Sequence, residues 1–212
     1  MRTHPGALPP CLAWTLSSAL FLLGCGDSGS SNTLGDHPTL IGQLQGWSRG
    51  DGYTLTASLV PVSSNIPTLA MAPIDTAGNF RITLPGNDAL SMYLSAQHVS
   101  RDQLSAGCQS SDLQATPADF RSGVLQLNAV GAAGTIGVTQ ATNSGTKISY
   151  LFVDRNLDET GRISCLLPGA SLSQSLDLHF VAGWNAQLST QSGSTYVLTS
   201  GNVPADAKWQ AP

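Results

Sequence analysis

The sequence predicts an all-β protein, an antiparallel β-sandwich built from short strands. Several stretches alternate apolar and polar residues with a period of two, which is the pattern of a half-buried strand. Stretches rich in turn-forming residues separate them, and the 212 residues include 22 Gly and 12 Pro. Long amphipathic helical patterns are absent from the sequence, and this also favours the all-β class.

The alternating stretches define the expected strands in chain order. The clearest is the run Tyr53-Thr54-Leu55-Thr56-Ala57-Ser58-Leu59-Val60. The expected strands cover residues 53–60, 79–84, 124–127, 148–153, 176–181 and 196–199. Turn-forming sequences are found at 49–52, 76–79, 84–87 and 191–194. The sequence predicts no helix longer than a turn or two, and residues Asp112 to Phe120 form the best candidate.

The charge of the chain excludes some partners. Charged residues make up 10% of the sequence, against about 25% in ordinary soluble domains. The formal net charge is −4, and no basic patch is present, so we expect no nucleic-acid partner. Electrostatic adhesion to anionic lipid is disfavoured for the same reason. Attachment to a membrane would therefore need a lipid or a spanning helix.

The N-terminal segment has the features of a leader peptide. Arg2 precedes an apolar run over residues 12–23, which is about a dozen residues, whereas a membrane-spanning helix needs about 20. We therefore interpret residues 1–24 as a signal peptide. The run ends in Leu22-Leu23-Gly24-Cys25, which resembles the lipobox of bacterial lipoproteins. This resemblance implies cleavage before Cys25 and attachment of acyl chains, such as palmitate, to that cysteine.

The lipobox resemblance also implies a location. The mature protein would be held on the periplasmic or cell-surface side of the bacterial envelope. Gly26, in place of Asp, favours the outer membrane by comparison with enterobacterial sorting, and the choice between the two membranes stays open. The alternative is an ordinary leader in which Cys25 is incidental. Residues 25–38 are rich in Gly, Ser and Asn and are expected to form a flexible tether.

The four cysteines suggest one disulfide bond. Cys11 would leave with the leader and Cys25 would be acylated, so Cys108 and Cys165 remain in an oxidising compartment. Pairing of these two is the simplest interpretation. A metal site is the alternative, and the wide separation and the lack of clustered histidines speak against it.

Two stretches of the body carry a resemblance to known families. Residues 41–47 and 74–84, with the sequence Asp75-Thr76-Ala77-Gly78-Asn79-Phe80, resemble the opening of transthyretin-like and carboxypeptidase-regulatory-like modules. Residues 181–185 and 200–209 are similar to the ending of small uncharacterised all-β bacterial surface lipoproteins. The resemblances imply an Ig-like or transthyretin-like sandwich. It would be either one elongated body or two small modules, here placed at 39–110 and 111–212.

Signals for a functional site are weak. Asp154, Asn156 and Asp158 place oxygen ligands at alternating positions and are the candidate calcium ligands, although Glu159 and Cys165 exclude an EF-hand. The alternative is a polar hairpin turn between strand 150–153 and a strand at Ile163. The serine of Gly26-Asp27-Ser28-Gly29 resembles that of trypsin-like proteases and GDS esterases. A tether offers it no rigid scaffold, base or oxyanion hole.

Trp47 and Trp184 suggest a further site. Each follows a Gly at a strand boundary. Aromatic rings at the rim of a sandwich can stack on sugars. More often such rings fill the ends of the core. His37, His98 and His179 are scattered singly, although Asp177 and His179 would share one face of a strand.

Together these features predict a lipid-anchored envelope protein with a structural or binding role, no enzymatic activity and no cofactor. The partner would be the membrane, through the acyl chains, and another envelope protein or a glycan. The alternatives are a carbohydrate-binding module and a calcium-stabilised adhesion-type module.

Overall fold

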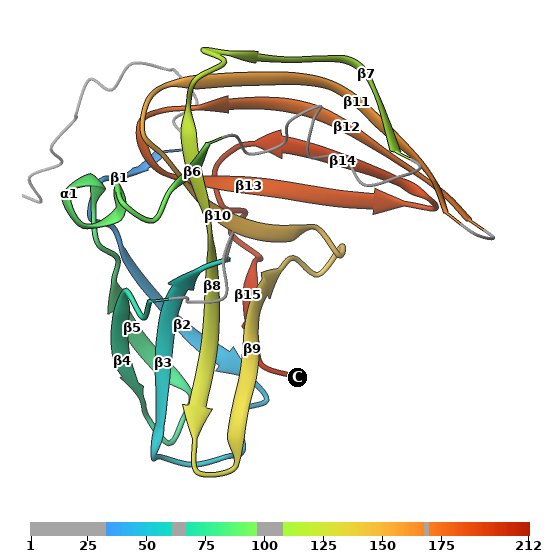
Figure 1. Ribbon diagram of the computed structural model, residues 1–212. Helices are drawn as coiled ribbons and strands as arrows, with labels where there is room; N and C mark the ends of the chain where they lie inside the picture. Colours follow the sequence, from blue (N-terminus) through green and yellow to red (C-terminus); the bar gives the residue numbers. More distant parts are fainter. Residues whose placement is uncertain (1–32, 61–66, 97–107, 168–169) are drawn as a thin grey trace, which may run out of the picture.

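The computed structural model describes residues 33–60, 67–96, 108–167 and 170–212, and nearly all of its regular structure is β-strand (Figure 1). One short helix, α1 (Asn87–Leu90), is present among these residues. The strands are β1 (Thr33–Gly35), β2 (Thr39–Gln45), β3 (Tyr53–Leu59), β4 (Ala70–Ile74), β5 (Asn79–Thr83), β6 (Ser95–Ala96), β7 (Cys108–Thr116), β8 (Arg121–Gly131), β9 (Gly134–Ala141), β10 (Lys147–Val153), β11 (Leu157–Leu167), β12 (Ala170–Phe180), β13 (Gly183–Ser192), β14 (Thr195–Ser200) and β15 (Lys208–Gln210).

The strands form two parts that are connected where β8 pairs with β10. In the lower part of Figure 1, the strand order β4–β3–β8–β9–β15–β2–β5 wraps around one core, and the β4–β5 connection closes the other side. In the upper part, β10, β13, β14, β12, β11 and β7 continue as a curved sheet of long strands. The all-β, sandwich-like class predicted from the sequence is therefore confirmed.

The sheet is mixed and not purely antiparallel, which corrects the sequence prediction. β12 pairs with β14 in parallel, and β15 pairs with β2 in parallel. Neither parallel pair joins strands that are consecutive in the chain. β13 follows β12 in the chain, but in the sheet β14 lies between them. β14 is antiparallel to β13 and therefore runs parallel to β12.

Two hydrophobic clusters stabilise the two parts. The larger one fills the lower part and contains Leu55, Phe80, Phe152, Trp184 and Trp209 among its buried members. The smaller one lies on the upper sheet. It consists of Phe120, Leu151, Val153, Leu157, Ile163, Leu176, Leu178 and Phe180. The larger cluster draws on both of the ranges 39–110 and 111–212, and the division of the chain into those modules stays a prediction.

The local sequence pattern predicts many of the observed strands. The predicted strands lie within one residue of β3, β5, β8, β10, β12 and β14 or inside them. At the β4–β5 turn, the Asp75 carboxylate accepts hydrogen bonds from the backbone N–H groups of Ala77 and Asn79 at 2.9 and 2.8 Å. Gly78 has a φ of 83°, and Phe80 is buried. These are the roles that the Asp-x-x-Gly-x-Phe pattern predicts for a turn followed by an anchored strand.

The predicted helix at Asp112 to Phe120 is wrong. Its first part belongs to strand β7, which pairs with β11 from Cys108 to Thr116. Two residues, Asp112 and Leu113, face the single residue Gly161, so the ladder contains a β-bulge, and Asp112 has a φ of 54°. A Cβ on Gly161 would lie 2.5 Å from the Cα of Leu113, so glycine is required opposite the bulge. Pairing with β11 thus overrides the weak local helix preference.

The expected tether 25–38 is shorter than predicted at its C-terminal end. Thr33–Gly35 forms β1, which pairs with the start of β13. The Asp36 carboxylate then accepts a hydrogen bond from the backbone N–H of Asn87 at 2.9 Å, at the start of α1. These backbone contacts fix the chain to the body from Thr33 onward. Residues 1–32, including Cys25, lie outside the described residues.

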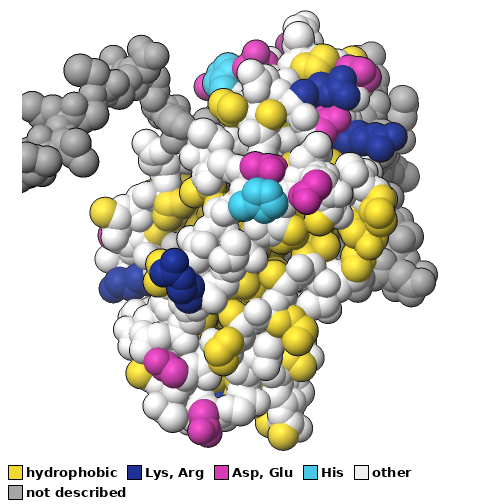
Figure 2. All heavy atoms as spheres, turned by 90° about the vertical axis from the view of Figure 1, so that its left-hand side faces the viewer, with side chains coloured by type: hydrophobic (Ala, Val, Ile, Leu, Met, Phe, Trp, Pro, Cys, Tyr) yellow, Lys and Arg dark blue, Asp and Glu magenta, His cyan; other side chains and the backbone are white. Residues whose placement is uncertain are grey.

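The surface shows the low charge of the chain. On the face in Figure 2, Lys, Arg, Asp and Glu side chains are few and scattered among uncharged polar atoms and small hydrophobic areas. In the described ranges, no helix has the length and apolar character that crossing a membrane would require.

Replacing Gly42 with alanine is expected to lower the free energy of unfolding by about 1–3 kcal/mol, the usual cost of overpacking a core. A Cβ on Gly42 would lie 2.2 Å from Cδ1 of Trp209, whose ring packs edge-on against Phe80. Gly137→Ala is the matched control, because Gly137 is also in a strand and a Cβ there meets nothing within 4 Å. Urea unfolding of both variants measures the difference, and equal stability would contradict this packing.

Candidate functional site

A polar pocket of about 450 Å³ opens beside α1, where the start of β8 meets the end of β10. Elements far apart in sequence build it. α1 and the turn after it contribute one side, and the segments just before β8 and just after β10 contribute the other. The lining residues are Asn87, Ser91, Leu94, Asp119, Arg121, Asp154 and Arg155.

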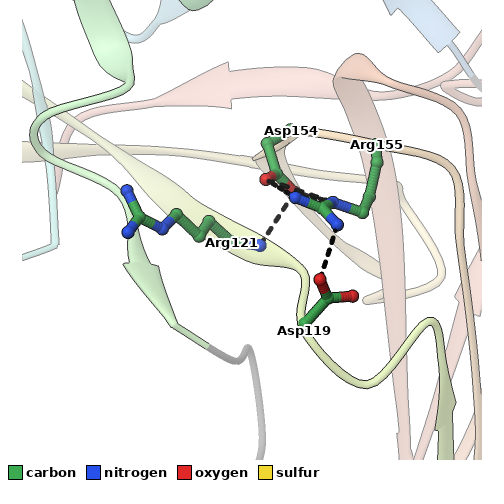
Figure 3. Close-up of polar contacts among 4 residues, drawn as sticks. All are labelled: Asp119, Arg121, Asp154 and Arg155. Carbon is green, nitrogen blue, oxygen red and sulfur yellow. Dashed lines mark hydrogen bonds and ion pairs between the residues drawn. The ribbon is translucent and has the colours of Figure 1, made fainter.

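An ion-pair cluster shapes one wall of this pocket (Figure 3). Arg155 Nη1 lies 2.9 Å from Asp119 Oδ2, and Arg155 Nη2 lies 3.0 Å from Asp154 Oδ2. Asp154 also accepts a hydrogen bond from the backbone N–H of Arg121 at 2.8 Å, and its side chain is only 15% exposed. The hydrogen bond that Arg155 donates to the Asp154 carboxylate is the main cause that raises the pKa of the Arg155 guanidinium. The cluster therefore holds Arg155 in one place.

The side chain of Arg121 points the other way. Figure 3 shows its guanidinium directed away from Asp154 and Arg155. Among the described residues, its guanidinium makes no hydrogen bond or ion pair. An arginine offers five N–H donors in a fixed plane. With the amide of Asn87 and the hydroxyl of Ser91, the pocket offers donors and acceptors suited to a ligand rich in hydroxyl or carboxylate groups.

The calcium candidates do not share one partner. Asp154 accepts from Arg121 and Arg155, Asn156 accepts from the backbone N–H of Ala182 at 3.0 Å, and Asp158 contacts His179. Each side chain is thus engaged with a different part of the sheet. In the part of the chain that the structure describes, no group of three His, Cys, Asp or Glu side chains could hold a metal ion.

The hairpin alternative for residues 154–158 is wrong. The segment connects β10 to β11, but the two strands do not pair with each other. β10 pairs with β13, β8 and β9, whereas β11 pairs with β12 and β7. The segment therefore crosses from one part of the sheet to the other, which is why its side chains reach several strands.

His179 lies between two carboxylates on the surface of the upper sheet. Its Nδ1 is 2.6 Å from Asp158 Oδ1 on β11, and its Nε2 is 3.1 Å from Asp177 Oδ1 on β12. The shared face of Asp177 and His179 that the sequence predicts is confirmed. The hydrogen bond to Asp158 is the largest cause that raises the pKa of the His179 imidazole. When the ring is protonated, both of its N–H groups donate to carboxylates.

Removing one carboxylate is expected to reverse this shift. In Asp158→Asn, the pKa of His179 should fall toward the ordinary histidine value of about 6.5. Because the folded-state pKa is raised, the stabilisation by this cluster is fully present below the unfolded-state pKa and is lost as pH rises through the folded-state pKa. An NMR titration of the ring protons measures the change. Asp51→Asn, in an exposed loop, is the control, and an unchanged His179 titration in Asp158→Asn would contradict the assignment.

Two of the three tryptophans that the structure describes are buried in the core. Trp184 is fully buried and packs edge-on against Phe152 at 5.4 Å between ring centroids. Trp209 is buried and stacks on Tyr150. Trp47 is half-buried, contacts Tyr53 edge-on, and donates its Nε1–H to the Gly50 carbonyl at 2.9 Å. Trp184 therefore offers no exposed ring face on which a sugar could stack.

The two body cysteines form a disulfide bond, as the sequence predicts. Cys108 on β7 and Cys165 on β11 are directly opposite each other in the ladder, and their Cα atoms are 3.9 Å apart. The bond therefore joins an edge strand of the upper sheet to its neighbour. Ser28 and the proposed acylation site Cys25 lie outside the described residues, and both interpretations stay predictions.

Comparison with known proteins gives no relative: no protein-family model, no curated protein and no solved structure matches the chain.

The residues of the polar pocket were missed by the sequence reasoning, apart from Asp154. No local pattern connects Asn87 on α1, Asp119 before β8 and Arg155 after β10. The sequence held one partial indication of this pocket. Asp154 and Arg155, an acidic and a basic residue, are adjacent directly after a buried strand. In a chain with so few charges, such a pair is worth testing as a site.

Proposed function

We propose that this chain is a lipid-anchored protein of the bacterial envelope whose β body has a non-enzymatic binding role. The observation that carries the proposal is the disulfide between Cys108 and Cys165. Disulfides persist in exported proteins and are rare in the cytosol. The bond therefore supports the interpretation of residues 1–24 as a leader, and Leu22-Leu23-Gly24-Cys25 supports an acylated cysteine at its end.

The start of the folded body is consistent with an anchor at Cys25. β1 begins at Thr33, so seven residues lie between Cys25 and the first described strand. An extended chain spans about 3.3–3.6 Å per residue, so this linker reaches roughly 25 Å at most. The body would therefore stay close to the lipid surface. Its partner would be another component of the same envelope layer.

Cell fractionation tests the anchor. The wild-type protein should sediment with membranes and be released by detergent, whereas Cys25→Ser should not be acylated. Cys11→Ser is the matched control, because Cys11 lies inside the leader and its loss should leave membrane association unchanged. Wild-type protein in the soluble periplasmic fraction would overturn the proposal.

A glycan ligand is the second candidate, and the polar pocket favours it. Sugar hydroxyls need donors and acceptors at several angles, and Asn87, Ser91, Asp119 and Arg121 provide both. In this proposal the binding groups are polar side chains, and the tryptophans stay in the core.

Co-sedimentation with purified peptidoglycan sacculi tests this second candidate. Protein carrying Cys25→Ser should sediment with the sacculi, and adding Arg121→Ala should lower the bound fraction severalfold. Arg49→Ala removes the same charge from an exposed loop outside the pocket and is the control. Equal binding by the Arg121 and Arg49 variants would reject the pocket as the glycan site.

A further inference from the structure

A second pocket, of about 270 Å³, lies at a gap in the lower sheet. β8 pairs with β9 only as far as Leu127 opposite Val138, and with β10 only from Val124 opposite Leu151. β9 and β10 are joined by two residue pairs, at Ala141–Lys147 and Gln140–Ile148. The three strands therefore stop pairing at different residues, and side chains of β8, β9, β10 and β15 line the pocket between them.

The inner part of this pocket is apolar. Leu125, Leu127, Val138 and Ile148 line it, together with the rings of Tyr150 and Trp209. These two rings are stacked, with centroids 5.8 Å apart and planes at 18°.

The polar groups of Tyr150 and Gln140, in the inner part of the pocket, form a hydrogen bond with each other. The Tyr150 hydroxyl donates to Gln140 Oε1 at 2.5 Å. Burial raises the pKa of the Tyr150 phenol, so that group stays neutral at ordinary pH. The inner pocket is therefore an uncharged site for an apolar group, with an aromatic ring pair as part of its wall.

The mouth of the pocket is polar and basic. Lys147 lines it together with Thr139, Ser149 and Gln210. Lys147 and Lys208 are the only lysines of the chain, and both are in register with Ala141, one on each side. Residues in register on neighbouring strands point to the same face, and strands lie about 4.8 Å apart, so the two lysine backbones are roughly 10 Å apart.

The charges around the two lysines leave the mouth positive. Among the described residues, neither ammonium group makes a hydrogen bond or an ion pair. Asp206 is two residues from Lys208, and its carboxylate accepts a hydrogen bond from the backbone N–H of Asn143 at 3.2 Å. No acidic residue lines the pocket itself.

We propose that this gap binds a small amphiphilic anion, with an aromatic or short aliphatic part against Tyr150 and Trp209 and a carboxylate at Lys147. The volume sets the size. At about 270 Å³ the pocket lies near the lower end of the roughly 300–1,000 Å³ usual for ligand pockets, so the ligand is small. The site is separate from the polar pocket and does not depend on the lipid anchor.

Ligand binding to the full chain carrying Cys25→Ser tests the proposal, with phenylacetate as the probe and phenylacetamide as its neutral counterpart. Phenylacetate should shift the NMR signal of the Trp209 indole N–H, with a Kd on the order of 1 mM for so small a molecule. Lys147→Gln should weaken phenylacetate binding about fivefold, because one exposed charge-assisted contact is lost. Phenylacetamide should bind the unmodified pocket about as weakly as phenylacetate binds the Lys147 variant.

Two controls make the result specific. Arg49→Gln removes a positive charge from a distant loop and should leave the affinity unchanged. Ala141→Leu adds volume at the mouth and should weaken both probes. The proposal is overturned if phenylacetate does not bind at about 10 mM, if it binds without shifting Trp209, or if Lys147→Gln and Arg49→Gln bind it equally.

Discussion

Replacing Trp184 with alanine is expected to lower the free energy of unfolding by about 3–5 kcal/mol, the range for removing a large buried aromatic side chain. The indole is fully buried in the larger core cluster, and its ring packs edge-on against Phe152. Its Nε1–H donates to the Pro85 carbonyl at 2.8 Å, which ties β13 to the segment before α1. The substitution leaves a cavity and an unpaired carbonyl, and both effects destabilise the fold.

Urea unfolding of the Cys25→Ser chain measures this effect. Trp47→Ala is the matched control, because Trp47 is only half-buried and its indole donates to Gly50 within its own loop. The Trp47 variant should lose clearly less stability than the Trp184 variant. Losses of equal size would show that Trp184 does not have the central packing role described above.

The second large effect concerns the disulfide. Replacing both Cys108 and Cys165 with serine is expected to cost about 4 kcal/mol, because the bond closes a loop with a sequence separation of 57 residues and restricts the unfolded chain. Urea unfolding of the double variant, compared with wild type before and after reduction, measures the change. Reduced wild type should match the double variant. A double variant as stable as oxidised wild type would contradict a stabilising role for the bond.

Local sequence predicted the strands with the clearest alternation and the turn at Asp75. In β5 burial alternates strictly because one face packs against the core, and in β3 and β10 it alternates over the first residues before the strand becomes buried on both faces. The turn at residues 75–79 is equally local, since Asp75 binds backbone groups two and four residues away. These features need no knowledge of the rest of the chain.

Features that depend on strand pairing could not be predicted. The stretch at Asp112 is polar and short, and only its pairing with β11, with a bulge opposite Gly161, makes it a strand. Glu159 is fully buried on β11, although its neighbours in sequence suggest an exposed loop. Burial there follows from the pairing of β11 with both β12 and β7. A single sequence contains no signal for that position in the sheet.

The candidate sites show the same limit. The polar pocket joins α1 to residues on both sides of β8 and β10, and the sheet gap exists because three strands stop pairing at different residues. The sequence named Asp154, Asn156 and Asp158 as candidate calcium ligands, but their alternating spacing could not show that they contact different strands. Lys147 and Lys208 are 61 positions apart in sequence (208 − 147). They lie near each other because their strands pair with β9 on opposite sides of Ala141.

The most direct test of the proposed function is the intact mass of protein purified from bacterial membranes. We expect a chain that begins at Cys25, carries the added mass of acyl chains, and is two hydrogens lighter than the fully reduced form because Cys108 and Cys165 are joined. A chain cleaved at another position and free of lipid would contradict the anchor, and the protein would then be a secreted β protein without attachment to the envelope.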